Sequence, residues 1–266
     1  MLRTSAHPEN NRFFCQKIGK GPNLLIALHG FSKSSAVFQK LEQKIGKTYT
    51  ILAIDLPFHG KTLWEENHYT QKDLSLFIEE LLLQYGASQF SLMGHSLGGR
   101  IALTLAPAFS GRLAHLCLLA PDGLSTRRMT VPEILPLSVR KIIAKRLHQP
   151  APLLKLAKVL HQIHLLDGFT IKYLNYHLDD PKRRDRLLKT WVSLVDFKVG
   201  KQQLLTLSKM NPQLRMVLVL GKKDPLIRVK SLQKKLRGNP NLEIKVLDQG
   251  HHLIGKELAE ILLDLA

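Results

Sequence analysis

The most informative stretch of this sequence is Gly94-His95-Ser96-Leu97-Gly98-Gly99. An apolar run at 90–93 precedes it and a helix-like run at 100–109 follows it, so the serine is predicted at a turn from a strand into a helix. In a G-x-S-x-G turn, glycines allow close backbone approach and leave the serine hydroxyl exposed at the tip. The first amides of the helix can then stabilise a developing anion. The pattern predicts a nucleophilic Ser96; the alternative is an ordinary glycine-rich turn.

Length and composition predict an α/β protein with a large core. The chain has 266 residues and 44% hydrophobic content, enough for one core with a modest insertion. Apolar runs at 24–28, 49–54, 90–93, 116–119, 216–220 and 242–247 alternate with helical patterns at 37–45, 71–85, 100–109, 229–236 and 256–265. Near-continuous apolar strands separated by helices predict a mostly parallel central sheet with helices on both faces.

Features that would indicate a membrane span, secretion or a cofactor are missing from the sequence. It has no run of about 18 apolar residues and no apolar stretch typical of a signal peptide. Two cysteines, Cys15 and Cys117, are too few for a disulfide framework and favour a reducing compartment, so we expect a cytoplasmic protein. His161 and His164 have no third ligand at metal spacing, and no nucleotide-binding motif occurs. We therefore predict no metal and no cofactor.

Reactive residues follow several of the predicted strands. In open α/β sheets, ligands bind beyond the carboxyl ends of the strands. At these positions lie His29-Gly30-Phe31, Asp55, Ser96, Asp224 and His251. The order serine, acid, histidine is the order of an α/β-hydrolase triad and differs from those of chymotrypsin-type and subtilisin-type enzymes.

These motifs resemble the α/β-hydrolase fold superfamily, in its capped single-domain form that includes esterases, lipases and C–C hydrolases. The likeness covers nearly the whole chain except its middle. It rests on an HG-x strand end, a D-x-P-x-x-G turn, the serine turn, a G-x-x-D-P turn and a terminal G-H, in that order. One position departs from the family: Phe58 stands where the family turn D-x-P-G-x-G has its first glycine. Because a bulky residue disfavours positive φ, we expect either another loop path or a Phe58 side chain that projects toward the substrate pocket.

The resemblance implies a role for each of three residues. Ser96 would be the nucleophile, His251 the base that takes its proton, and Asp224 the acid that orients the imidazole. The base and the acid each have an alternative. His252 adjoins His251, and Asp122 follows the preceding strand, a place where some family members carry the acid.

The resemblance also implies residues around the nucleophile. The backbone amides of Phe31 and Leu97 would form the oxyanion hole. His29, Phe58 and Arg100 are assigned to substrate binding, although a buried, backbone-bonded His29 is the stronger expectation. Arg100 together with His29-Gly30-Phe31 also makes the chain similar to the menaquinone-pathway SHCHC synthase branch, a lyase group in which arginines hold substrate carboxylates. The alternative is an arginine that solvates the first helical turn.

The charge of the chain is concentrated in its middle. It carries 39 Lys and Arg against 21 Asp and Glu, a net charge of +18, and residues 124–210 hold 17 of the basic residues but only six acidic ones. Leu, Ile and Val at helical spacing, interrupted by prolines, predict several short helices there. We therefore predict a basic helical cap at 124–210, inserted between core segments 1–123 and 211–266.

A basic cap allows three interpretations. It is a solvated face, it attracts an anionic substrate into the cleft, or it binds nucleic acid or an anionic membrane surface. The aromatic content of 6% and the lack of a recognition motif speak against nucleic acid. We expect a small-molecule substrate; the oligomeric state stays open.

Together these features predict a serine hydrolase that cleaves an ester, thioester or related carbonyl substrate through an acyl-enzyme. The first alternative is a lyase of the SHCHC synthase type, and the second is a non-catalytic binding member of the fold.

Overall fold

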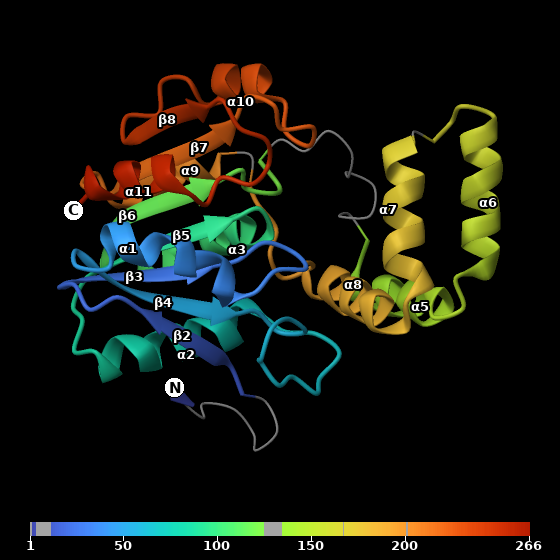
Figure 1. Ribbon diagram of the computed structural model, residues 1–266, viewed down its shortest axis with the longest axis horizontal. Coiled ribbons are helices and arrows are strands. Elements are labelled where there is room, and N and C mark those ends of the chain that lie inside the picture. The colour runs from blue at the N-terminus through green and yellow to red at the C-terminus, as the bar shows by residue number, and fades with distance from the viewer. Residues whose placement is uncertain (1, 4–11, 125–134, 167, 201) are drawn as a thin grey trace. The chain divides into compact units, whose positions relative to one another are not determined.

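The computed structural model describes residues 2–3, 12–124, 135–166, 168–200 and 202–266. Within them lies an eight-stranded sheet with the order β1-β2-β4-β3-β5-β6-β7-β8 (Figure 1). The β1–β2 and β2–β4 pairs are antiparallel, and every pair from β4 to β8 is parallel. The strands are β1 (Leu2–Arg3), β2 (Phe14–Ile18), β3 (Asn23–Leu28), β4 (Tyr49–Asp55), β5 (Phe90–His95), β6 (Leu113–Leu119), β7 (Arg215–Gly221) and β8 (Leu242–Leu247).

The α/β prediction is confirmed, and all six predicted runs are strands. The central strands β3, β4 and β5 are almost entirely buried, which explains why their sequences are continuous apolar runs and do not alternate. The antiparallel β2 was not predicted. It is short and carries Gln16 and Lys17, so its apolar signal is weak.

Helices cover both faces of this sheet. In Figure 1, α1 and α11 lie on one face and α2 and α3 on the other, and the members of each pair are in contact. The predicted helix 100–109 begins three residues earlier, at Leu97, and changes into a 3-10 turn before Pro107. The helical segments around the sheet are η1 (Ser35–Leu41), α1 (Glu42–Ile45), α2 (Gln71–Gln84), α3 (Leu97–Leu105), η2 (Ala106–Phe109), α9 (Gln203–Met210), α10 (Val229–Leu236) and α11 (Lys256–Leu263).

The chain divides into two compact units. The first comprises Met1–Glu65, Thr70–Met129 and Phe197–Ala266, and the second comprises Glu66–Tyr69 and Thr130–Asp196. The second unit is thus shorter than the predicted insertion 124–210, because α9 belongs to the first unit. Gln203 Nε2 donates to the Leu103 carbonyl at 2.9 Å, and Leu204 and Leu207 are buried. The expected cap function of the second unit stays a prediction.

The second unit is helical in its described part. One hydrophobic cluster of this unit consists of Ala144, Leu188 and Val192, with Leu137, Leu147 and Trp191 packed against it. None of the helices in the described ranges combines the length and the hydropathy that crossing a membrane requires. The helices of this unit are α5 (Leu137–Leu147), α6 (Ala151–Gln162), α7 (Gly168–Asp179) and α8 (Pro181–Ser193).

Candidate active site

Ser96 lies at the sharp turn between β5 and α3, as the sequence predicted. Its backbone has φ 51° and ψ −113°, a conformation that costs a non-glycine residue about 1–3 kcal/mol. The glycines on either side make this turn possible. A Cβ at Gly94 would collide with the Gly98 carbonyl, and a Cβ at Gly98 would collide with the carbonyl of Leu28 on β3. The packing of α3 against the sheet therefore requires glycine at both positions.

The structure brings Ser96, His251 and Asp224 together from three loops. Ser96 Oγ lies 2.9 Å from His251 Nε2, and His251 Nδ1 lies 2.7 Å from Asp224 Oδ2. An ionised carboxylate can only accept, so the proton of the neutral imidazole is on Nδ1 and Nε2 accepts from the serine hydroxyl. This arrangement leaves Nε2 placed to take the hydroxyl proton.

Asp224 is held as a carboxylate. Burial raises its pKa, but hydrogen bonds from His251 and from the Leu226 amide outweigh burial and hold the pKa below its ordinary value. The Asp224 side chain is fully buried, while that of His251 is 18% exposed. A buried anion therefore stands behind the imidazole and can stabilise its protonated form.

The competing acid, Asp122, has a different partner. Its Oδ2 lies 3.0 Å from an Arg100 guanidinium nitrogen, and its amide donates to the Ser96 carbonyl at 3.0 Å. The local competitor His252 is exposed, with its ring centre 6.2 Å from that of His251. In this arrangement Asp224 and His251, not Asp122 and His252, are hydrogen-bonded in line with the serine.

Arg100 is buried, with only 3% of its side chain exposed. Arg100 Nε also donates to the carbonyl of Phe197 at 2.8 Å. Phe197 is the residue at which the chain enters the first unit again after the second. A Cβ at Gly123 would lie 3.7 Å from the guanidinium carbon. The expectation of a solvated arginine is therefore wrong. The proposed contact with a substrate carboxylate gains no support either, since the guanidinium holds the two chain segments that lead to and from the second unit.

His95, within the serine turn, was not singled out from the sequence. It is 4% exposed, and its Nε2 donates to the carbonyl of His251 at 2.8 Å. Burial lowers the pKa of His95 to about 4, so this imidazole is neutral at ordinary pH. This hydrogen bond holds the backbone of His251, whose ring faces Ser96. The available signal was its position at the end of an apolar strand, where a polar residue needs a partner.

Two elements pass beside the serine where the oxyanion hole is predicted. Leu97 opens α3, and the first amides of a helix have no acceptor within that helix. A Cβ at Gly30 would lie 3.4 Å from Ser96 Cβ, so the strand end carrying Phe31 passes directly beside the serine. The assignment of the Leu97 and Phe31 amides as an oxyanion hole stays a prediction.

His29 and Phe58 lie in the loops that follow β3 and β4. His29 is fully buried; its Nε2 accepts from the Leu56 amide at 3.0 Å, and its Nδ1 donates to the Gly30 carbonyl at 2.8 Å. This agrees with the backbone-bonded interpretation of His29 rather than with substrate contact. Phe58 itself adopts the positive φ, 67°, of the family's glycine position, so the loop does not avoid that conformation. Whether Phe58 contacts substrate stays a prediction.

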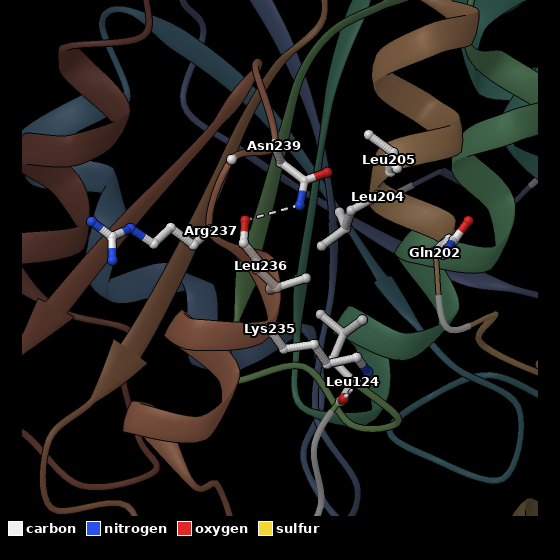
Figure 2. Close-up of a pocket in the computed structure, with 9 residues that line it drawn as sticks. Leu124, Gln202, Leu204, Leu205, Lys235, Leu236, Arg237 and Asn239 are labelled. Atoms are coloured by element: carbon white, nitrogen blue, oxygen red, sulfur yellow. Dashed lines mark hydrogen bonds between the residues drawn. The ribbon is translucent and has the colours of Figure 1, made fainter.

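A separate pocket of about 190 Å³ lies elsewhere in the first unit (Figure 2). Leu204 and Leu205 of α9 line it, together with Lys235 and Leu236 of α10. Asn239 donates to the Leu236 carbonyl at 2.9 Å at its edge. Ser96, His251 and Asp224 are not among its lining residues, so this pocket is not the candidate site.

Comparisons with known proteins identify the family of this chain. A family model described as the alpha/beta hydrolase fold matches residues 23–257. The chain is 26% identical over 246 residues to the uncharacterized hydrolase YugF of Bacillus subtilis, covering 91% of this chain and 88% of that protein.

Solved structures show the same fold. A thermophilic esterase from Thermogutta terrifontis matches with a TM-score of 0.67 at 16% identity, covering 94% of this chain and 92% of the esterase. A probable hydrolytic enzyme from Pseudomonas aeruginosa PAO1 matches with a TM-score of 0.70 at 16% identity, covering 99% and 92%. The chain belongs to the alpha/beta hydrolase fold family and is a hydrolase.

Proposed function

We propose that the protein is a serine hydrolase that cleaves an ester, thioester or related carbonyl substrate through an acyl-enzyme. The observation that carries the proposal is the hydrogen-bonded line from Ser96 through His251 to Asp224, with distances of 2.9 and 2.7 Å. Nucleophile, base and orienting acid are within hydrogen-bond reach of one another, which is the geometric requirement for an activated serine.

The reaction follows from these contacts. Ser96 Oγ attacks the carbonyl carbon while its proton moves to His251 Nε2, and the carbonyl electrons move onto the oxygen. His251 then returns the proton to the leaving alcohol or thiol as its bond to carbon breaks, which leaves an acyl-serine. Water repeats the sequence with His251 as base and releases the acid. Asp224 stays ionised throughout and stabilises the imidazolium.

The amides of Phe31 and Leu97 would bind the oxyanion that forms in both steps. Donors already in place for this charge are worth about 3–4 kcal/mol each in comparable sites. The Gly30 backbone beside Ser96 and the open first turn of α3 support this assignment.

The lyase alternative is less well supported than the serine hydrolase. It relied on Arg100 as a carboxylate-binding group, and Arg100 is buried with Asp122 and the Phe197 carbonyl. A purely binding member of the fold would have no use for an aligned serine, histidine and buried carboxylate. Attraction of an anionic substrate remains a further proposal, supported by the net charge of +18. A cytoplasmic location likewise stays a prediction, based on Cys15 and Cys117, which are both buried and free.

A fluorophosphonate probe tests the proposed nucleophile. We expect it to label the wild-type protein and the matched control Ser138→Ala, whose serine is exposed on α5, but not Ser96→Ala. Hydrolysis of p-nitrophenyl esters should be lost with the label. A wild-type protein that is folded by circular dichroism, takes up no probe and hydrolyses no ester would refute the proposal.

A salt series tests the anionic preference. If steering operates, kcat/KM for an anionic ester falls as salt rises from about 0.01 to 1 M, where the Debye length shortens from about 30 to 3 Å, while a neutral isostere is unaffected. Equal salt dependence for both esters would remove this part of the proposal and leave the serine chemistry intact.

A further inference from the structure

Exposed apolar side chains are concentrated in the second unit. Of 14 large hydrophobic side chains that are exposed among the described residues, eight lie in this unit. Those of the first unit lie on several elements, with Leu76 and Leu83 together on α2, which is ordinary for a protein surface. In the second unit, by contrast, several of them share one helix and the residues directly after it. That clustering needs a physical explanation.

The apolar residues of α6 form a stripe along one side of the helix. Leu156, Val159 and Ile163 are 53%, 52% and 57% exposed and follow one another at spacings of three and four residues. This spacing puts them on one face. Ala157, by contrast, is buried, and α6 packs against α7. The stripe is therefore distinct from the face that holds α6 in its unit.

Cations border this stripe, and acids are missing from the helix. Lys155 and Lys158 each precede a residue of the stripe by one position and are exposed. A step of one residue turns a helix by about 100°, so both lysines lie beside the stripe and on the same side of it. We call Leu156, Val159 and Ile163, with Lys155 and Lys158, the α6 face.

The neighbouring helix α5 repeats the combination. Val139 and Ile142 are exposed at a spacing of three, and Arg146 continues their row four residues later. Lys141 and Lys145 are exposed as well. Neither α5 nor α6 contains a single Asp or Glu. Two consecutive helices therefore present apolar side chains and uncompensated positive charge to solvent.

We propose that the α6 face binds the surface of an anionic lipid bilayer, with the helix lying in the interface. An interfacial helix buries an apolar face at the level of the acyl chains while lysines at its border contact lipid phosphates. Both parts of the α6 face are used in this arrangement. The inference goes beyond the proposed hydrolysis and does not depend on it.

Other occupants use only part of this surface. Nucleic acid would neutralise the lysines but leave the apolar stripe in water. A second copy of the chain in a symmetric dimer would set the same lysines near their own equivalents, with no acid on α6 to offset the repulsion. A bilayer with anionic headgroups satisfies the apolar and the charged residues together.

Vesicle co-sedimentation with the full-length protein tests the proposal. We expect binding to vesicles of phosphatidylglycerol and phosphatidylcholine in equal parts, weaker binding at high salt, and little binding to phosphatidylcholine alone. Lys155→Gln with Lys158→Gln should weaken binding about 20-fold or more, since each basic residue near an anionic surface contributes about fivefold. Replacing Leu156, Val159 and Ile163 by serine should weaken it by at least about tenfold.

Matched controls come from the first unit. Lys230→Gln with Lys234→Gln removes two exposed lysines from α10, and Leu83→Ser removes a leucine of α2 that is 77% exposed. Both controls should bind vesicles like the wild type, and circular dichroism should show all variants folded.

Three results would overturn the proposal. The first is an absence of binding to the anionic vesicles at low salt. The second is binding that the serine substitutions leave unchanged, which would indicate a purely electrostatic surface such as one for nucleic acid. The third is self-association in analytical ultracentrifugation that the serine substitutions abolish, together with no vesicle binding, which would assign the face to a second copy.

Discussion

The two compact units differ in where they place charged and apolar groups. In the first unit, the central strands are buried and functional polar residues such as Asp55 and Asp224 lie inside, bonded to amides or to an imidazole. In the second unit, eight large apolar side chains of the described residues are exposed, and basic side chains such as Lys155 and Lys158 reach solvent as well. The polar residues named in the first unit therefore make internal contacts, whereas the exposed apolar and basic residues of the second unit form an outer surface.

Among the described residues, each unit has one deeply buried arginine, and the two are held differently. Arg100 pairs with the carboxylate of Asp122 and bonds to the carbonyl of Phe197. Arg140 donates to the carbonyls of Leu135 and Trp191 and lies over the Trp191 ring at 5.6 Å. Both guanidinium groups join segments that are distant along the chain, so each has a structural role in its unit.

The largest expected effect is on kcat/KM, and it distinguishes Asp224 from Asp122 as the candidate acid. Asp224→Asn should lower kcat/KM for a p-nitrophenyl ester by about 10⁴, because the amide no longer favours the required imidazole tautomer or stabilises its charge. Asp122→Asn should leave kcat/KM within about tenfold of wild type. Steady-state kinetics of both purified variants measure this, and a greater loss in Asp122→Asn would reverse the assignment.

The next effect is on stability. Arg100→Met should lower the free energy of unfolding by about 3 kcal/mol, because it leaves the partly buried Asp122 carboxylate without its guanidinium partner. Urea titration followed by tryptophan fluorescence and circular dichroism gives the value. Adding Asp122→Asn should recover part of the loss. If the double variant is as unstable as the sum of the two single variants, the pair does not interact as described.

A pH effect of intermediate size is expected from His95. Its pKa is about 4 in the folded protein and about 6.5 in the unfolded chain, so the unfolded state binds more protons between these values. Stability from this group is therefore present above about pH 6.5 and is lost as pH falls toward 4. Between about pH 7 and pH 5 the loss should be about 2 kcal/mol.

His95→Gln provides the comparison, since its amide can still donate to the His251 carbonyl without titrating. We expect a shallower decline of the unfolding free energy with falling pH in the variant than in the wild type. Parallel declines would show that His95 is not the group responsible.

The smallest effects should come from the outer surface of the second unit. Lys141→Gln and Ile142→Gln on α5 should each change the free energy of unfolding by less than about 0.5 kcal/mol, because both side chains are exposed. Thermal unfolding measures the change. A loss above about 1 kcal/mol would mean that this surface is covered in the folded protein and would weaken the contrast between the units.

Much of the first unit could be predicted because its signals are local. The apolar runs predicted six strands, and the glycines around Ser96 predicted a tight turn, since both patterns depend on neighbours in the chain. The antiparallel β2 was missed because a short strand with Gln16 and Lys17 has almost no pattern. The end of the second unit was misplaced for a related reason: α9 has the same helical period whichever unit it packs against.

By itself, the sequence determined the α/β class, the serine turn and the small set of acids and histidines that could accompany it. Only the tertiary structure brought Asp224, and not Asp122, within hydrogen-bond distance of His251, paired Arg100 with Asp122 and joined His95 to the His251 carbonyl. The physical reason is separation along the chain. His251 lies 155 residues from Ser96 and 27 from Asp224, and only the order of the parallel strands brings such distant side chains within hydrogen-bond distance.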